Sequence, residues 1–314
     1  MTTLLDRALD ASVVLGYSKV GYAVRRHLSD WPADPAPGSL SGRDVVVTGA
    51  SSGLGIATAQ GLASLGARVH LVVRDVEKGS RVRADLARAV PSASFEVWRC
   101  DVSDLDDVRR FAAELRDAAP ALAGLVHNAG AMPPQRTESS QGHEMTMALH
   151  VLGPLLMTEL LLQPLAGGRV VLVTSGGMYT QRLPVDDPEY LAGTYKPPTA
   201  YARSKRTQVS LLPVLAARWT GVGVHATHPG WADTPGVVDS LPTFRKITGP
   251  ILRDAEEGAD TTVWLTAVDP APASGQLWQD RHPRPAHYLG RNRETAEERR
   301  RMWEWVRDAA GLSS

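Results

Sequence analysis

Disulfides, surplus charge and long apolar runs are all missing from this chain of 314 residues. Its single cysteine, Cys100, excludes an internal disulfide and a zinc site built from cysteines, which suits a reducing, cytoplasmic setting. Basic and acidic side chains number 34 each, so no basic surface indicates nucleic acid or an anionic membrane as a partner. No apolar run approaches the roughly 20 residues that span a bilayer. We therefore expect a small neutral or amphipathic ligand.

Three segments are predicted along the chain. Residues 1–41 are expected to form an N-terminal helical extension, which ends in a linker rich in proline, glycine and serine. The domain itself is expected at 42–290, with a substrate lid at about 231–255, and a charged C-terminal helix at 291–314. Acidic residues dilute the basic ones in the extension, which favours packing or an oligomer contact over a membrane surface. A monomer and a homodimer both stay open.

Short runs rich in β-branched residues alternate with longer helical patterns after the linker. Strands are predicted at 44–49, 68–73, 93–98, 123–128, 168–175 and 222–228. Helices are predicted at 55–65, 75–89, 105–118, 143–162, 199–219, 257–267 and 295–311. Unbroken apolar strands separated by helical crossovers are typical of a parallel sheet covered on both faces. The fold class is therefore α/β, a doubly wound and mostly parallel Rossmann-type sheet in a single domain.

A glycine-rich turn, TGASSGLG, follows the first predicted strand at 48–55. Gly49, Gly53 and Gly55 allow a tight turn that brings bare backbone N–H groups against a pyrophosphate, at the N-terminus of the next helix. The same pattern could merely join a strand to a helix. Its place after the first strand of an alternating α/β sequence favours a bound dinucleotide.

The end of the second strand distinguishes the two nicotinamide dinucleotides. An acidic residue there accepts from the ribose hydroxyls of NAD, whereas an arginine can pair with the 2′-phosphate of NADP. Arg74 comes directly after the strand and Asp75 follows it. We expect NADP(H) to be preferred, with Ser51 or Ser52 as phosphate donors. NAD(H) remains possible if Asp75 turns inward or if Arg74 is only a solvated loop charge.

Two further strand ends offer positions beside a cofactor. Asp101 follows the third strand and could accept from the adenine amino group, although it or Asp104 could instead cap the next helix. The small residues of HNAG, at 127–130, end the fourth strand and let the backbone pass close beneath a cofactor.

Tyr201 and Lys205 lie four residues apart on a predicted helix and therefore share one face. A neighbouring ammonium stabilises a phenolate, so Lys205 is expected to lower the pKa of Tyr201 from its usual value of about 10. Ser175 ends the fifth strand, where its hydroxyl could hold a substrate carbonyl oxygen beside the tyrosine. Each residue alone has an ordinary structural explanation. Together, after a cofactor turn, they predict catalysis.

These motifs resemble the short-chain dehydrogenase/reductase family over roughly 42–277. The resemblance rests on TGASSGLG, HNAG, the serine of VTSGG, YARSK and HPGWADT. It implies that Ser175 positions the substrate, that Tyr201 transfers the proton and that Lys205 binds the cofactor ribose. It also implies a cofactor site formed by Thr48, Gly49, Ser51, Ser52, Gly53, Leu54, Gly55, Arg74, Asp101, Val102, Asn128, Ala129, Gly130, Tyr201, Lys205, Pro229, Gly230 and Thr234.

The glycine spacing is similar to that of the family's non-extended oxidoreductase branch. Tyr201 follows Ser175 by 26 positions, which is long for the family and resembles its retinol-dehydrogenase-type group, whose members act on lipophilic carbonyls and alcohols. The resemblance implies an oxidoreductase for a lipophilic carbonyl or secondary alcohol, and with Arg74 it predicts dependence on NADP(H). A non-catalytic NADP(H)-binding sensor or scaffold protein is the alternative.

One departure from the family pattern concerns His150. This residue stands where the family usually has an asparagine, which bends the helix and links the lysine to solvent in a proton relay. Histidine could replace that role through its own proton exchange near neutral pH, or weaken it. A purely structural histidine is the alternative.

Several remaining residues have two interpretations each. The side chains of Met132, Met178, Tyr179 and Trp231 could line an apolar substrate pocket or pack in the core. The two histidines of HATH, at 225–228, fall in the sixth predicted strand, where residues three apart face opposite sides. We therefore expect no metal site there.

Overall fold

An eight-stranded sheet forms the centre of the molecule, in the order β3-β2-β1-β4-β5-β6-β7-β8. The computed structural model describes residues 4–233 and 249–312. Neighbouring strands are parallel except for the last pair, β7 and β8. The strands are β1 (Asp44–Thr48), β2 (Arg68–Val73), β3 (Ser94–Arg99), β4 (Leu122–His127), β5 (Arg169–Val173), β6 (Gly223–Thr227), β7 (Gln276–Gln279) and β8 (His282–Arg284).

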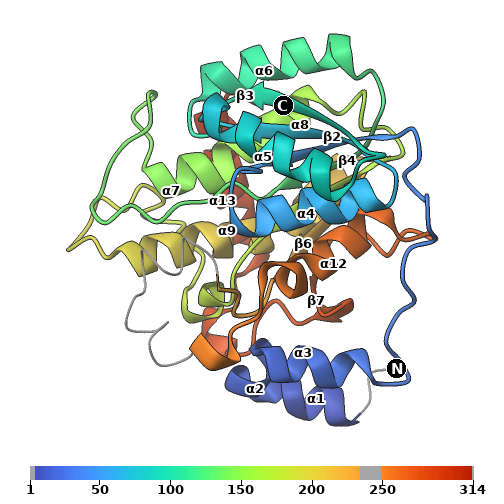
Figure 1. Cartoon of the computed structure of the whole chain (residues 1–314). Helices are drawn as coiled ribbons and strands as arrows, with labels where there is room; N and C mark the ends of the chain where they lie inside the picture. Colours follow the sequence, from blue (N-terminus) through green and yellow to red (C-terminus); the bar gives the residue numbers. More distant parts are fainter. Residues whose placement is uncertain (1–3, 234–248, 313–314) are drawn as a thin grey trace.

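Helices cover both faces of this sheet, which makes it a doubly wound Rossmann-type structure (Figure 1). Successive strand residues point to opposite faces, so Val46 lies in the core on one side while Val45 and Val47 lie in the core on the other. The second core includes α4 (Gly53–Ser64), α5 (Val76–Ala89) and α12 (Ala255–Ala267). The first includes α6 (Leu105–Ala118), α8 (Gly153–Leu160), α9 (Pro197–Arg218) and α13 (Ala296–Ala310). Three short 3-10 turns are η2 (Gly176–Thr180), η3 (Gly249–Ile251) and η4 (Gly290–Asn292).

The six predicted strands are present close to their expected bounds, and the mostly parallel α/β class is confirmed. The sequence pattern does not predict β7 and β8. Their sequences, QLWQ and HPR, are too short and too polar to form an apolar run of strand length. They form a hairpin whose two-residue turn is Asp280 and Arg281.

The helix predicted at 143–162 is interrupted. It consists of α7 (Met145–Met147), the π-turn η1 (Ala148–Leu152) and α8. Pro154 has no N–H to donate to the carbonyl of His150 four residues earlier, so that carbonyl is released from the helix. It accepts instead from Gln208 Nε2 on α9, at 2.6 Å.

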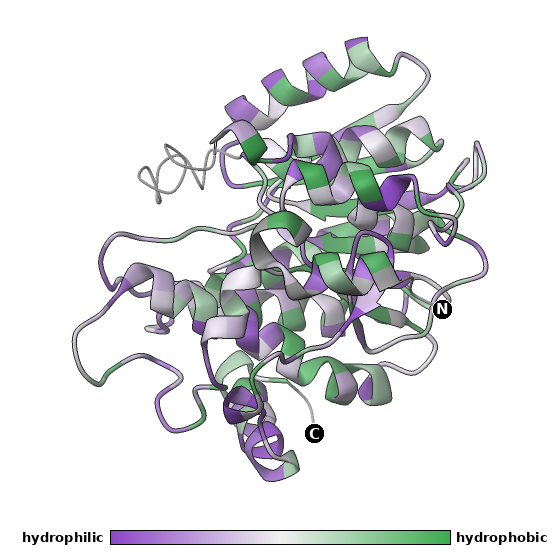
Figure 2. Cartoon of the chain, turned by 90° about the horizontal axis from the view of Figure 1, so that it is seen from below, coloured by the Kyte–Doolittle hydropathy of each residue, from purple (hydrophilic) through white to green (hydrophobic). Residues whose placement is uncertain are grey.

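Three short helices precede the sheet: α1 (Leu4–Ala11), α2 (Val13–Tyr17) and α3 (Lys19–Arg26). They lie together at the lower end of the molecule in Figure 1, below β7. Figure 2 shows that the outer helices carry both polar and apolar residues. No helix within residues 4–233 and 249–312 combines the length and the apolar character needed to cross a membrane.

Candidate active site

The candidate site lies along one edge of the sheet. Because β1, β2, β4, β5 and β6 are parallel, their carboxyl ends meet at that edge. The glycine turn, Arg74, Asn128, Ser175 and Pro229 each follow one of these strands. From β1 the chain continues to β2 and β3 on one side, and from β4 it continues to β5 and β6 on the other. Proteins of this architecture bind dinucleotides in the crevice between these two strands, where the direction of the connections reverses.

The glycine turn has the bare backbone that a pyrophosphate requires. Gly49 and Gly53 adopt φ values of +67° and +47°, in the left-handed region that favours glycine. A Cβ on Gly49 would lie 2.7 Å from Ala129 Cα, and one on Gly55 would lie 2.3 Å from the Gly49 carbonyl oxygen. Side chains are therefore excluded where the turn opens onto the N-terminus of α4, and the site fits a dinucleotide phosphate.

Thr48 joins the ends of β1 and β4. Its Oγ1 accepts from the backbone N–H groups of Asn128 and Ala129, both at 3.0 Å. Asn128 Nδ2 donates in return to the carbonyls of Thr48, at 3.1 Å, and Gly49, at 3.4 Å. These bonds hold the glycine turn rigidly against HNAG, so Asn128 acts on the cofactor position by supporting the turn.

The acidic candidates near the adenosine position have local partners. Asp75 caps α5 by accepting from the Lys78 N–H at 2.9 Å, and Asp104 caps α6. Asp101 does not cap that helix, because its Oδ1 accepts from the N–H and hydroxyl of Ser103, at 3.0 and 2.6 Å. Arg74 is exposed at the end of β2.

Ser175, Tyr201 and Lys205 meet at the end of β5. Ser175 precedes η2, where its Oγ accepts from the Gly177 N–H at 3.3 Å. The Tyr201 side chain lies next to it. Lys205 Nζ donates to the Val173 carbonyl at 2.8 Å and lies 5.7 Å from the centre of the Tyr201 ring. The structure thus brings together the three residues that the sequence singles out for catalysis.

The electrostatics of this group differ from the sequence-based expectation. Burial raises the pKa of Tyr201, and the neighbouring Ser175 side chain opposes this rise only partly. The expected lowering by Lys205 is wrong here, because burial also lowers the pKa of Lys205, to about 7. The amine is therefore only partly protonated at neutral pH, and it donates to a backbone carbonyl instead of the phenol.

Replacing Lys205 by methionine is expected to stabilise the protein, with an effect that depends on pH. The folded pKa, about 7, lies below the ordinary 10.5, so between these values the unfolded chain binds more protons and stability rises with pH. The methionine variant does not have to bury a protonated amine, and the loss of stability that this burial causes in the wild type is complete below pH 7. We expect its free energy of unfolding to be higher by on the order of 1–3 kcal/mol at pH 6, with the gain shrinking toward pH 10. Urea unfolding at both values tests this, and an equal effect at both would contradict it.

His150 has both ring nitrogens occupied. Nε2 accepts from the Ala131 N–H at 3.2 Å, which assigns the proton to Nδ1, 2.7 Å from Ser204 Oγ. Ser204 donates in turn to the Tyr201 carbonyl at 2.8 Å. Burial lowers the pKa of His150 well below 6.5, which favours the structural alternative over proton exchange near neutral pH. The neutral imidazole instead packs edge-on against the Tyr201 ring, at 5.2 Å between centroids.

Sequence reasoning does not single out Ser204 and Gln208, although both support the site. They lie three and seven positions after Tyr201, on the same face of α9, and both are buried. Buried polar residues at helical spacing from a candidate catalytic tyrosine are the signal that would identify them.

The segment after β6 carries the residues expected beside the nicotinamide. Pro229 and Gly230 lie there, and the Gly230 N–H donates to His228 Nδ1 at 2.9 Å. Gly230 adopts φ +75°, which again favours glycine. Thr234 lies outside the described residues, as does most of the lid predicted at 231–255.

The four residues predicted to contact substrate separate into two groups. Met178 is fully buried in the core, so core packing and not substrate binding explains its side chain. Tyr179 is directed elsewhere, since its hydroxyl donates to the Pro285 carbonyl at 2.9 Å. Met132 and Trp231 are partly buried in the segments that follow β4 and β6.

His225 and His228 are buried separately. Burial lowers the pKa of His225 to about 4 and that of His228 to about 3, so both are neutral. Among the residues that the structure describes, no group of three or more His, Cys, Asp or Glu could hold a metal ion.

Fold and site together define a class: a Rossmann-type nucleotide-binding oxidoreductase with a serine, a tyrosine and a lysine at the substrate position. A family model described as short chain dehydrogenase matches residues 43–185. Dehydrogenase/reductase SDR family member 12 from Bos taurus is 34% identical over 300 residues, covering 94% of each chain. The chain belongs to the short-chain dehydrogenase/reductase family, and it is an oxidoreductase that acts on CH–OH groups with NAD(P).

Other relatives agree with this assignment. "Putative daunorubicin C-13 ketoreductase DnrU" from Streptomyces sp. (strain C5) is 39% identical, covering 79% of this chain and 86% of its own. Retinol dehydrogenase 12 from Homo sapiens is 33% identical, covering 87% and 88%. The crystal structure of an uncharacterised protein from Mycobacterium Paratuberculosis superposes with a TM-score of 0.69 at 29% identity, covering 87% and 95%.

Proposed function

We propose that this oxidoreductase prefers NADP(H) and interconverts a lipophilic carbonyl with its secondary alcohol, with Tyr201 as the general acid or base. One observation carries the proposal. The side chains of Ser175 and Tyr201 lie next to each other and beside the Lys205 amine, at the sheet edge that also holds the glycine turn. A protein that only bound the nucleotide would have no need of all three side chains together.

Each group has a distinct task in this mechanism. The Ser175 hydroxyl holds the substrate oxygen, and Tyr201 gives its phenolic proton to that oxygen during reduction and takes it back during oxidation. Lys205 favours the phenolate whenever its amine is protonated. His150 and Ser204 position Tyr201 through its ring and its carbonyl. When bound at this edge of the sheet, a nicotinamide cofactor would supply the hydride transfer.

The preference for NADP(H) is supported by the end of β2. Asp75, the residue that would favour NAD(H), has its carboxylate engaged at the start of α5. Arg74 is exposed beside the glycine turn, where a guanidinium can form two parallel hydrogen bonds with a phosphate. The 2′-phosphate of NADP is the group that such an arginine recognises.

Replacing Arg74 by alanine is expected to weaken NADPH binding by about 10- to 100-fold and to leave NADH binding within about twofold, because only NADPH carries the 2′-phosphate. Nucleotide fluorescence titrations measure both dissociation constants. Arg83→Ala removes an exposed arginine from α5 and is the matched control. An equal loss for both nucleotides, or no loss for either, would refute the role of Arg74.

The lipophilic substrate class is supported by Met132 and Trp231, which are partly exposed in the segments that follow β4 and β6. It is also supported by the names of two relatives, one a ketoreductase and one a retinol dehydrogenase. Consumption of NADPH with a panel of aliphatic, aromatic and polycyclic ketones and aldehydes tests the class. Tight NADPH binding without turnover of any of them would favour a nucleotide-binding sensor or scaffold instead.

A further inference from the structure

The N-terminal helices are joined to the end of the sheet by buried charges. Arg25 Nε donates to Asp6 at 2.7 Å and its Nη1 donates to Asp280 at 2.7 Å. Arg253 binds the same Asp280 carboxylate through two nitrogens, at 2.6 and 2.9 Å, and Arg284 binds Asp6. The side chains of Arg25, Asp6, Asp280 and Arg253 are each about 1% exposed. Charges buried to this degree require a single docked arrangement, since any other would leave one of them unpaired.

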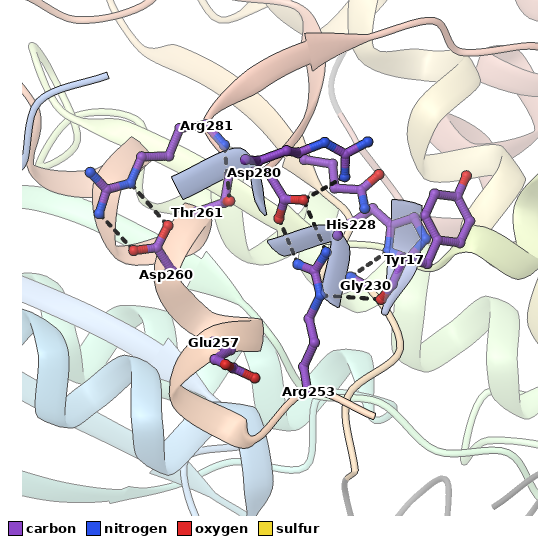
Figure 3. Close-up of polar contacts among 12 residues, drawn as sticks. Tyr17, His228, Gly230, Arg253, Glu257, Asp260, Thr261, Asp280 and Arg281 are labelled. Carbon is purple, nitrogen blue, oxygen red and sulfur yellow. Dashed lines mark hydrogen bonds and ion pairs between the residues drawn. The ribbon is translucent and has the colours of Figure 1, made fainter. Parts of the chain in front are cut away.

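The β7–β8 turn depends on that arrangement. Its two central residues, Asp280 and Arg281, adopt φ values of +50° and +57°, a conformation that usually calls for asparagine or glycine. Figure 3 shows the Asp280 carboxylate facing Arg253, and Arg281 paired with Asp260 of α12. Arg281 also donates to the carbonyl of Pro32 in the linker at 3.1 Å. The strained turn is therefore held partly by residues of the N-terminal extension.

Tyr17, at the end of α2, connects this network to the candidate active site. Its carbonyl accepts from the Trp231 N–H at 2.8 Å and from Arg253 Nε at 3.1 Å. Its ring packs edge-on against His228 and Trp231, at centroid distances of 4.4 and 6.2 Å. Figure 3 shows Tyr17, His228 and Gly230 side by side above Arg253. The segment after β6, which is expected beside the nicotinamide, is therefore held in place by Tyr17 of the N-terminal helices.

The same ring also contacts the turn that carries the catalytic serine. Gly176 follows Ser175, and a Cβ built on it would lie 2.4 Å from His228 Nε2 and 3.0 Å from Tyr17 Cε2. Only a glycine allows these two rings to pack on the backbone at this point. Tyr17 and His228 therefore occupy the space between the turn after β5 and the turn after β6.

We propose that Tyr17 is a positioning residue which sets the separation between Ser175 and the segment 229–231. Reactive groups that are displaced by about 1 Å can lose on the order of 100-fold in rate, so a fixed spacer at this place controls turnover. The ring performs this task, because the Tyr17 hydroxyl is buried without a hydrogen-bond partner in the described structure.

The kinetic test compares four forms of the full chain and rests on the proposed function. Tyr17→Leu removes the ring and is expected to lower kcat with the best ketone about 10- to 100-fold, while the dissociation constant for NADPH stays within about threefold. Tyr17→Phe keeps the ring and should restore kcat to within about twofold of the wild type. Leu9→Ala, which removes another buried side chain from the extension, should leave kcat unchanged. Equal losses in Tyr17→Leu and Leu9→Ala would show general loosening and overturn the proposal.

Hydrogen exchange provides a readout that does not need turnover. The amides of Gly177, Gly230 and Trp231 are hydrogen-bonded in the two turns. Their exchange is expected to be at least about fivefold faster in Tyr17→Leu than in Tyr17→Phe. Unchanged exchange would refute the proposal even if the enzyme were active. Faster exchange in a protein that reduced no ketone would support it while the proposed function failed.

A second variant covers the case in which Tyr17→Leu does not fold. Gly176→Ala leaves the extension intact but inserts a methyl group against the two rings. It should lower kcat to a similar extent, again with NADPH binding retained. Full activity in Gly176→Ala would show that the spacing of the two turns does not matter, which overturns the proposal.

Discussion

Tyr201→Phe is expected to lower kcat by about 10²- to 10⁴-fold, the usual contribution of a positioned general acid or base. Phenylalanine keeps the ring that packs edge-on against His150, and it removes only the hydroxyl that lies beside Ser175. The dissociation constant for NADPH should therefore stay within about twofold. Steady-state kinetics with the best ketone and a fluorescence titration measure the two quantities.

A matched control for this loss is Tyr190→Phe. Tyr190 lies in the segment between Ser175 and Tyr201, and its hydroxyl donates to the Thr194 carbonyl at 3.2 Å. The same chemical change there should leave kcat within about twofold of the wild type. Retention of full turnover in Tyr201→Phe would disprove the assignment of that residue, whatever the control shows.

Asp280→Asn is expected to lower the free energy of unfolding by about 3–5 kcal/mol, because it leaves the guanidinium groups of Arg25 and Arg253 buried beside a neutral amide. Asparagine tolerates the positive φ of this position, so the change isolates the charge. Urea unfolding measures the effect. The control Asp85→Asn breaks an exposed ion pair with Arg88, whose partners are 67% and 77% exposed, and should cost at most about 0.5 kcal/mol.

The Asp280 carboxylate also makes the free energy of unfolding depend on pH. The guanidinium groups of Arg253 and Arg25 hold the pKa of Asp280 below 3.8 against the opposing effect of burial. Its contribution is therefore complete above about pH 4 and is lost as the pH falls through the folded pKa. The wild type should lose stability more steeply than Asp280→Asn below pH 4. Parallel curves for the two proteins would contradict this.

The fold and the glycine turn could be predicted because local patterns encode them. Apolar strand runs and glycines at a strand end depend on residues adjacent in the sequence, and the six long strands follow them. The four-residue spacing of Tyr201 and Lys205 likewise places both on one helix face.

Features that depend on contacts between distant parts of the chain could not be predicted from local sequence patterns. The release of the His150 carbonyl needs Pro154 on one side and Gln208 on another helix. The neutral state of the His150 imidazole follows from complete burial, which no local pattern reveals. The acidic residue at the end of β2 was ambiguous for the same reason, since only the cap at α5 shows where its carboxylate is engaged.

The docked extension has a consequence for how the chain folds during synthesis. Arg25 and Asp280 are separated by 255 positions, so the first helices leave the ribosome long before the carboxylate that neutralises them. At about 5–20 residues per second, the delay is on the order of 10–50 s. Until Asp280 has been made, Tyr17 is not fixed between the turn after β5 and the turn after β6. Nascent chains should therefore acquire the sheet first, and the competent active site only when translation is nearly complete.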